Sequence, residues 1–282
     1  MPSSPSGAEV SSQAVPGRRP LWAARPAGTR LVDRAWGRAG LRCLTLAVLL
    51  VAWQVAGTAG GVGLPSPART ATALAELLAD PAFHRALWAT NQALVLGFGL
   101  AVAVALPLGL LMGRLDLVNR TVRPYLSLLI AVPVIAFIPV IQATLGLTLS
   151  ARVAVVFLFS VAYVAVNCAV GVRSTDPALV EMARSFGAGR LATIREVVLP
   201  AAVPGLMAGV RVGLGQALIG MVVAELALVG AGVGSLIAEF QGRFQVASVM
   251  AVTLVVVAEG VLLLSLAAWC ERRLSRWKGG TA

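Results

Sequence analysis

Long apolar stretches alternate with short polar segments along most of the chain. Each apolar stretch is about as long as the roughly 20 largely apolar residues that a membrane-spanning helix needs. Six of them can be traced, at about 41–60, 87–113, 125–149, 151–173, 205–230 and 246–269. The third and fifth contain prolines or several glycines, which a helix bundle tolerates, so we expect these two spans to bend. The pattern predicts an all-α integral membrane protein with six transmembrane helices.

One polar segment, between the fourth and fifth stretches, carries more structure than a simple connection needs. It reads EMARSFGAGRLATIREVVLP from Glu181 to Pro200. Asp176 can cap a short helix that starts at Pro177, and Gly187 follows where a left-handed residue would end it. The apolar positions of this helix fall at i, i+3, i+4 and i+7: Leu179, Met182, Ala183 and Phe186.

A second short helix is predicted after Gly187. Leu191, Ile194 and Val197 or Val198 continue an apolar stripe, and we expect Pro200 to end it. A loop built as two short helices favours a docking surface for a soluble partner. The alternative is a surface helix that rests on its own bundle, since amphipathic interfacial helices are common in membrane proteins.

The basic residues are divided unevenly between the two sides of the predicted membrane. With the N-terminus inside, 18 of the 23 Lys and Arg residues lie on the cytoplasmic side. The opposite side receives Arg69, Arg85, Arg152 and Arg243, and Arg211 lies at the entrance to the fifth span. Positive residues that flank spans stay preferentially in the cytoplasm, so both termini are predicted to be cytoplasmic.

Composition agrees with a membrane protein and changes the interpretation of the charge. The chain is 58% hydrophobic and 12% charged, with a mean hydropathy of +0.87. Because topology explains the net charge of +11, no nucleic-acid partner is expected. We divide the chain into a disordered basic cytoplasmic tail (1–40), a six-helix transmembrane domain (41–271) and a short basic cytoplasmic tail (272–282), with membrane lipid around the helices.

The residues needed for several kinds of chemistry are missing from the sequence. A phosphate-binding loop of the form GxxxxGK[ST] needs a Lys followed by Ser or Thr, but the one lysine, Lys278, precedes Gly279. One histidine and three unpaired cysteines offer no metal cluster or catalytic constellation. We therefore expect no enzyme activity, no catalytic residue, no metal and no cofactor, with ATP hydrolysis on a separate subunit if transport is driven.

Polar residues inside the predicted spans are candidates for a transport pathway. Glu225, Gln142, Asn167 and Gln216 lie there. Each can line a route for solute or form a hydrogen bond between helices, and for Glu225 a contact with another polar group is an equal alternative. An ion-coupled secondary transporter remains an alternative function, although such proteins normally show repeats between their halves, and none is evident here.

The segment from Glu181 to Pro200 resembles the signature of the inner-membrane permease subunit of binding-protein-dependent ABC importers. That signature is EAA, three residues, Gly, nine residues, then Ile-x-Leu-Pro. Glu181, Ala183, Gly187, Leu199 and Pro200 match it, with Met182 in place of the second alanine and Val197 in place of the isoleucine. From LPSP at 64–67 to ERRLSRW near the end, the chain resembles the nitrate, sulfonate and taurine branch of that family.

The resemblance implies a role and a set of partners. It implies a permease that forms the substrate pathway as a dimer in the bacterial inner membrane, with a coupling-helix loop contacting two ABC ATPase subunits and an extracytoplasmic solute-binding protein docking outside. Glu181, Met182, Ala183, Phe186, Gly187, Val197, Leu199 and Pro200 would form that coupling loop. The implied solute is a small anion or vitamin precursor such as nitrate, a sulfonate or taurine, and neither its identity nor a homodimer rather than a heterodimer follows from the sequence.

Overall fold

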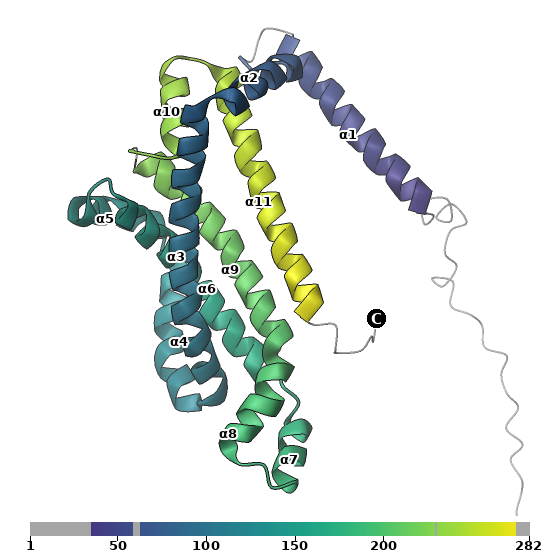
Figure 1. Cartoon of the computed structure of the whole chain (residues 1–282), viewed down its shortest axis with the longest axis vertical. Coiled ribbons are helices and arrows are strands. Elements are labelled where there is room, and N and C mark those ends of the chain that lie inside the picture. Colours follow the sequence, from purple (N-terminus) through teal and green to yellow (C-terminus); the bar gives the residue numbers. More distant parts are fainter. Residues whose placement is uncertain (1–34, 59–62, 229, 275–282) are drawn as a thin grey trace, which may run out of the picture. The chain divides into compact units, whose positions relative to one another are not determined.

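The computed structural model describes residues 35–58, 63–228 and 230–274, and the described residues are helical apart from short connections (Figure 1). The helices are α1 (Ala35–Thr58), α2 (Pro67–Ala79), α3 (Pro81–Arg114), α4 (Asp116–Ala131), the 3₁₀ turn η3 (Val134–Phe137), α5 (Ile138–Leu145), α6 (Leu149–Arg173), α7 (Pro177–Ser185), α8 (Arg190–Ala192), the π-helical turn η4 (Thr193–Val198), α9 (Leu199–Ala227), α10 (Val233–Gly242) and α11 (Val246–Leu274). Residues up to 54 and residues from 55 onward form two separate compact units.

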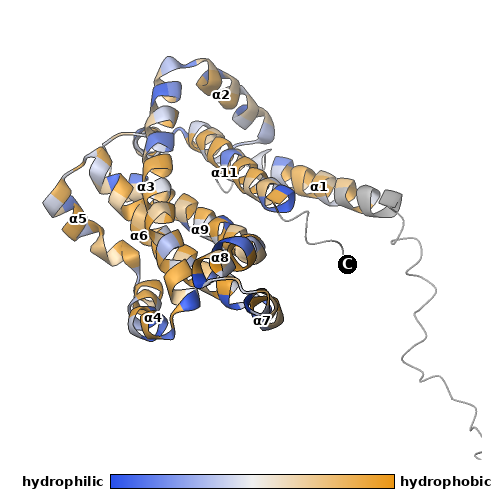
Figure 2. Cartoon of the chain, turned by 60° about the horizontal axis from the view of Figure 1, so that its bottom comes forward, coloured by the Kyte–Doolittle hydropathy of each residue, from blue (hydrophilic) through white to orange (hydrophobic). Residues whose placement is uncertain are grey.

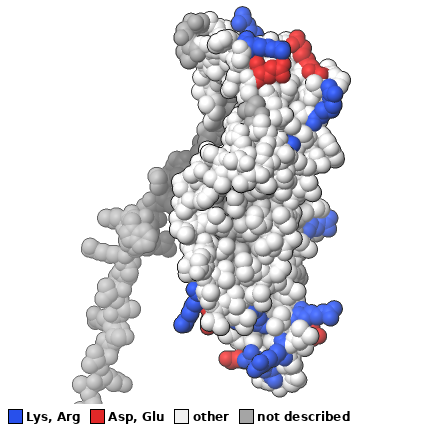
Figure 3. All heavy atoms as spheres, turned by 90° about the vertical axis from the view of Figure 1, so that its left-hand side faces the viewer, with Lys and Arg blue, Asp and Glu red and all other residues white. Residues whose placement is uncertain are grey.

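Four helices are long and apolar enough to cross a membrane on their own. They are α3, α6, α11 and the continuous run Arg190–Ala227 that contains α9. All four are dominated by hydrophobic residues, whereas α7 carries polar and apolar residues side by side (Figure 2). On the face in Figure 3, charged side chains gather toward the two ends of the bundle and few lie in the band between. This division is typical of helices that lie in a bilayer.

The expectation of six spans is not confirmed by the described residues. The predicted first span lies in α1, whose apolar part, Cys43–Thr58, is shorter than the roughly 20 residues that cross a bilayer. Helix α1 also begins at Ala35, before the predicted boundary at 41, and the rest of the predicted N-terminal tail lies outside the described residues. At the other end α11 runs on to Leu274, so the part of the C-terminal tail beyond it also lies outside them.

The predicted third span is broken, and the predicted fifth is not. Helix α4 ends at Ala131, Val132 and Pro133 are extended, and the helical segment Val134–Leu145 that follows is bent by 86° from α4. The expected bend therefore lies at Pro133, which lacks the N–H group that would continue the helix. The fifth stretch, in contrast, forms one continuous helix, α9, through Pro204. Up to five spans are present if the bent pair counts as one.

The core of the bundle is α6, which packs along α3 on one side and α9 on the other. Glycines on both neighbours face α6: Gly97, Gly109 and Gly113 of α3, and Gly205, Gly209, Gly213 and Gly220 of α9. At Gly171 of α6, a Cβ atom would lie 2.7 Å from the Gly205 Cα atom, which is closer than two carbons can approach. Small residues let helix backbones approach closely, and this contact is a main source of association energy in lipid.

A buried polar cluster, here called the clasp, ties four helices together at the end of the bundle opposite α7. Thr90 Oγ1 of α3 donates to Glu225 Oε1 of α9 at 2.6 Å, and the Gly234 N–H of α10 donates to Glu225 Oε2 at 3.0 Å. Arg152 of α6 places its Nη1 atom 3.8 Å from Glu225 Oε1. The Val233 N–H donates to Thr90 Oγ1 at 3.0 Å, so each member of the clasp has a partner.

The clasp is closed to solvent and fixes the turn between α9 and α10. Glu225 is 1% exposed, and Arg152 also donates to the carbonyls of Ala89 and Ala231 at 3.4 Å. A Cβ atom on Gly232, whose φ is +95°, would collide with the Glu225 carboxylate. Because a buried charge is tolerated only with partners, the clasp makes this end of the bundle depend on one carboxylate.

We expect Gly171→Ala to loosen the contact between α6 and α9, because the added methyl meets main-chain atoms that no side-chain rotation can move. Overpacking of this kind costs about 1–3 kcal/mol. Thermal unfolding in detergent measures it. Gly99→Ala is the matched control, since no atom lies within 4 Å of its added Cβ. Equal melting temperatures for the two variants would contradict close packing at Gly171.

We expect Glu225→Ala to destabilise the bundle by about 3–5 kcal/mol, because it leaves the buried Arg152 guanidinium without its carboxylate. Glu239→Ala is the control, because it breaks a half-exposed pair with Arg243 on α10 and such a pair contributes at most about 1 kcal/mol. Thermal unfolding in detergent again provides the comparison. Equal melting temperatures for the two variants would mean that the clasp does not stabilise the bundle.

Candidate functional site

The segment between α6 and α9 forms the candidate docking site, and local sequence signals build its first helix. The Asp176 side chain accepts a hydrogen bond from the Ala178 N–H at 2.9 Å, and Pro177 occupies the first turn of α7. Gly187 ends the helix with φ +83°, while the Ala188 N–H donates to the Ala183 carbonyl at 3.0 Å. This is the hydrogen-bond pattern of a glycine-terminated helix. The start and the end of α7 therefore lie where the sequence predicts them.

The second predicted helix differs from the structure. Helix α8 has three residues, and the chain continues through the π-helical turn η4 directly into α9. The Leu199 N–H donates to the Ile194 carbonyl, five residues earlier. Pro200 lies in the first turn of α9 and does not end a helix, because an N–H is not needed there. The loop is thus continuous with the long helix α9.

Helix α7 presents an apolar surface to its surroundings. Three of its four predicted apolar residues, Leu179, Met182 and Phe186, are exposed, and Phe186 is 87% exposed. Leu191 of α8 is also exposed, at 78%. These four side chains, here called the loop face, do not rest on their own bundle. An exposed apolar cluster of this kind is typical of a surface that binds another protein.

The remaining predicted loop residues frame this face. Glu181 is exposed on α7, Ala183 is half-buried, and Val197, Leu199 and Pro200 follow along η4 and the start of α9. Among the described residues, the ion pairs join Arg152 to Glu225, Arg173 to Asp116, Arg211 to Glu271 and Arg243 to Glu239. None of these pairs includes Glu181, so its carboxylate is available to a partner.

Buried groups anchor the loop to the bundle beneath it. Within the loop, Thr193 is buried and its Oγ1 donates to the Gly189 carbonyl at 3.0 Å, which ties η4 to the residue before α8. Val198 lies in the core with Ala202 and Leu206 of α9. At the end of α6, Arg173 pairs with Asp116 at 2.6 Å and so joins this end to α4. The loop face is therefore joined to α9 by continuous helix and to α6 by the short connection between Arg173 and Pro177, so a displacement of the loop would be transmitted to both helices.

The structure separates the four polar residues predicted within the spans. Glu225 is the centre of the clasp, so its carboxylate is taken by partners within the chain. Asn167 Nδ2 donates to the Tyr163 carbonyl of its own helix at 2.8 Å. Gln142 is exposed on α5, and Gln216 lines a cavity beside the break after α4. No single site brings the four together.

Two contacts of the spans were missed by the sequence reasoning. Arg152 was assigned to an outward connection, but it is buried in the clasp with Thr90. Its position inside an apolar helix, as the fourth residue of α6, was the available signal. Arg211 of α9 pairs with Glu271 of α11 at 2.9 Å, which no local pattern indicates.

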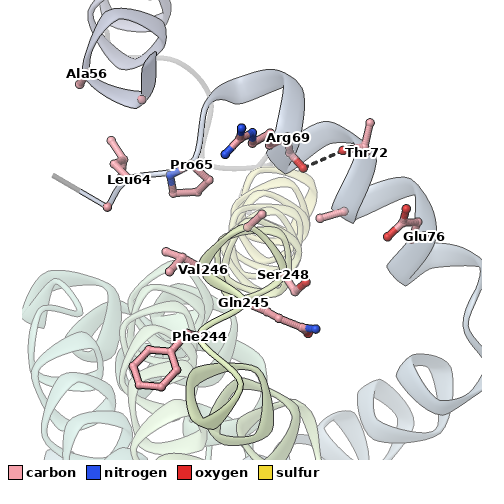
Figure 4. A pocket seen from close by; sticks show the side chains of 14 residues that line it. Ala56, Leu64, Pro65, Arg69, Thr72, Glu76, Phe244, Gln245, Val246 and Ser248 are labelled. Carbon is pink, nitrogen blue, oxygen red and sulfur yellow. Dashed lines mark hydrogen bonds between the residues drawn. The ribbon is translucent and has the colours of Figure 1, made fainter. Parts of the chain in front are cut away.

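A groove of 610 Å³ lies at the end opposite α7, between α2 and the start of α11 (Figure 4). Arg69 and Glu76 of α2 line one side, and Phe244, Gln245 and Ser248 line the other. Phe244 has φ +56°, a conformation that side chains rarely adopt, and it is 89% exposed. Strained and exposed aromatic residues tend to occur at binding surfaces. The groove is thus another surface, among the described residues, that is suited to a partner.

Comparison with known proteins identifies the family. Residues 105–276 match the family described as "Binding-protein-dependent transport system inner membrane component". The chain is 30% identical to a "Probable ABC transporter permease protein" of Brucella abortus over 85% of this chain and 96% of that protein. It is 30% identical to the taurine transport system permease protein TauC of Escherichia coli, over 83% of this chain and 88% of TauC.

The chain is also similar to a riboflavin permease and to a permease of known structure. The riboflavin transport system permease protein RibX of Chloroflexus aurantiacus is 33% identical over 86% of this chain and 91% of RibX. The crystal structure of an amino acid ABC transporter with histidines matches with a TM-score of 0.56 at 21% identity, over 71% of this chain and 97% of that one.

Family members are permease subunits rather than enzymes, and the apolar helices agree with a multi-pass protein of the inner membrane. The family match covers the loop face, Arg152 and Glu225 of the clasp, and the helices α6, α9 and α11, but it leaves out Thr90 and most of α3. The chain therefore belongs to the binding-protein-dependent ABC importer permeases, in their nitrate, sulfonate and taurine branch.

Proposed function

We propose that this chain forms the substrate pathway of an ABC importer as a dimer and that the loop face couples the pathway to two cytoplasmic ATPase subunits. The observation that carries the proposal is the exposure of Leu179, Met182 and Phe186 on a helix fixed at both ends. A soluble subunit that covers them would remove apolar surface from water, which contributes about 25 cal/mol per Å². Glu181 beside them offers a carboxylate for a basic side chain of that subunit.

The mechanism in this proposal is transmission of movement along helices. Because α8, η4 and α9 form one continuous run, displacement of the loop by the ATPase would move α9 as a lever. Since α9 packs closely against α6, the two helices would move together. Alternation between inward-open and outward-open states would then carry solute through the paired permeases, with the chemistry of ATP hydrolysis in the partner subunits.

The second partner in the proposal is an extracytoplasmic solute-binding protein. The groove between α2 and α11 lies at the end opposite the loop face, so a protein docked there would be on the other side of the membrane from the ATPases (Figures 1 and 4). The proposed solute is a small anion or vitamin precursor such as nitrate, a sulfonate or taurine. TauC and RibX support this range, because their names indicate taurine and riboflavin.

The orientation in the proposal places α7 and both termini in the cytoplasm. The basic residues Arg114, Arg173, Arg184, Arg190 and Arg195 lie near the α7 end, whereas Arg69, Arg85 and Arg243 lie toward the α2 and α10 end. This distribution agrees with the preference of positive residues for the cytoplasmic side.

We expect Phe186→Ser to reduce copurification of the ATPase subunits with the tagged permease, because Phe186 contributes the most exposed side chain of the loop face. Truncation of a buried aromatic at an interface costs about 2 kcal/mol or more, which is roughly a thirtyfold loss in affinity. Glu181→Ala is expected to act in the same direction, by about 1–3 kcal/mol. Phe244→Ser is the matched control at the opposite end and should retain the ATPase. Normal ATPase recovery with Phe186→Ser would exclude the loop face as the docking surface.

We expect a cysteine placed at Ser185 to react with an impermeant maleimide only from the cytoplasmic side, because α7 is assigned to that side. A cysteine at Thr72, an exposed position on α2, should react only from outside. Labelling of intact and of permeabilised cells separates the two. The reverse pattern would overturn the orientation and both docking assignments.

A further inference from the structure

Helix α11 carries an acidic side chain, Glu259, in the middle of its apolar sequence. It lies close to the midpoint of the helix, between Val256 and Leu263, which pack against an apolar cluster of α3, α6 and α9. The next residue, Gly260, also faces α9, since a Cβ atom there would lie 3.7 Å from the Leu218 side chain. Glu259 is therefore at membrane depth beside packed apolar side chains, where an ionised group is unfavourable.

The Glu259 carboxyl group has few polar neighbours. Its Oε2 atom is enclosed and has no hydrogen-bond partner among the described residues. The side chain that reaches the carboxyl group is the neutral amide of Asn91 on α3. Asn91 Nδ2 donates to the Leu87 carbonyl at 3.1 Å, whereas Asn91 Oδ1 accepts no hydrogen bond within the described part of the chain. Two acceptors thus lack a donor, and a proton on the carboxyl group would supply one.

No basic side chain of the described residues forms an ion pair with Glu259. Arg152 is engaged in the clasp by Glu225. Arg211 pairs with Glu271, which lies 12 residues further along α11, a distance of about 18 Å by helix rise. The other charged or titratable groups on the helices around α11 lie toward the two ends of the bundle: His84, Arg85 and Arg114 of α3, Arg69 and Glu76 of α2, and Glu239 of α10.

The neighbouring charge and the available ligands both oppose an ionised Glu259. The Glu225 carboxylate acts on it, and a second negative charge beside the first is unfavourable. A metal ion would need more ligands, since Ca²⁺ takes about six to eight oxygens. No group of three or more His, Cys, Asp or Glu side chains suited to a metal occurs in the described residues. A single proton, in contrast, removes the charge and supplies the missing donor.

We propose that Glu259 is a proton-binding site of the permease. The carboxyl group is held as the neutral acid between α3 and α11, and its O–H donates to Asn91 Oδ1. This pair joins two helices inside the membrane without a net charge. It is separate from the loop face and from the groove between α2 and α11, so it goes beyond the two docking surfaces of the proposed function.

A neutral acid inside the bilayer has a reactivity that an ionised one lacks. Dicyclohexylcarbodiimide is apolar, and the half-buried Glu259 side chain lies within its reach from lipid. The carboxyl oxygen bonds to the central carbon of the reagent, one C=N double bond becomes single, and the acid proton passes to that nitrogen. The acyl group then migrates from oxygen to nitrogen, which gives a stable N-acylurea that retains every atom of the reagent. Glu259 is therefore a modification site for this class of reagent.

One tryptic peptide contains both the site and its control. Trypsin cleaves after Arg243 and Arg272, and the peptide between them holds Glu259 and Glu271. Glu271 is the matched acid of the same helix, because its ion pair with Arg211 keeps it ionised. The full chain is treated with dicyclohexylcarbodiimide in membranes near neutral pH, and fragment masses assign the label to one acid or the other.

We expect the label on Glu259 to exceed that on Glu271 by about tenfold or more. Infrared spectroscopy of the chain in lipid decides the protonation state independently of access by the reagent. The spectrum of the parent minus that of Glu259→Gln should contain the C=O stretch of a protonated carboxyl group, while Glu225 is present in both and cancels. Glu259→Gln has the shape of the neutral acid, so it should keep the melting temperature of the parent.

Three results would overturn the proposal. They are equal labelling of Glu259 and Glu271, carboxylate bands in place of the C=O stretch in the difference spectrum, and a lower melting temperature for Glu259→Gln than for the parent. If neither acid is labelled, the infrared band alone decides. These measurements need neither the ATPase nor the solute-binding protein, so their result is independent of whether the loop face docks an ATPase.

Discussion

The close approach of α6 to α3 and α9 is the constraint on which the rest of the bundle depends. Water is absent between helices in a bilayer, so apolar side chains gain little by turning toward each other instead of toward lipid. Contact between backbones, which glycine permits, replaces that driving force. Gly171 and Gly205 meet with no side chain between them, and Gly109 places α3 against Ala165 and Cys168 of α6. These contacts make α3, α6 and α9 one packed body.

The two ends of this body differ in how their polar groups are used. At the clasp, the Glu225 carboxylate is satisfied within the chain by Thr90, Arg152 and the Gly234 N–H. At the α7 end, Glu181 and the loop face lie at the surface. A clasp that is buried and complete holds α9 to α10, whereas an exposed apolar face gains stability only by binding another protein. The proposed coupling uses this difference: the ATPase would move the α7 end, while the clasp would hold the other end of α9 against α10.

The features that depend on neighbouring residues were predictable from the sequence. The cap at Asp176, the proline at Pro177 and the left-handed Gly187 define α7 because each acts within one helical turn. A bend was expected in both the third and the fifth stretches; the third is broken at Pro133, whereas the fifth forms one continuous helix. The end assigned to Pro200 was wrong, because a proline in the first turn of a helix costs no hydrogen bond and the preceding π turn carries the chain into it.

The features that depend on distant parts of the chain were not predictable. From the sequence alone, Arg152 is assigned to an outward connection. Its partners Thr90 and Glu225 are 62 and 73 residues away along the chain, and only the packing of α3 and α9 against α6 brings them next to it. The cavity beside Gln216 requires the positions of α4, α6 and α9 together. The six apolar stretches in the sequence also do not show whether each forms one straight helix of sufficient length. The apolar part of α1 is shorter than a full span, and the α4–α5 pair is bent by 86°. The family resemblance, in contrast, rests on a local motif and agrees with the comparisons.

The central claim is that α7 is where the ATPase meets the permease, and a cryo-electron microscopy structure of the assembled importer measures it most directly. The account predicts that Leu179, Met182 and Phe186 are buried in a groove of the ATPase subunit and that the Glu181 carboxylate lies within ion-pairing distance of one of its basic side chains. A structure in which the ATPase contacts the membrane domain while these side chains remain open to solvent would contradict the account.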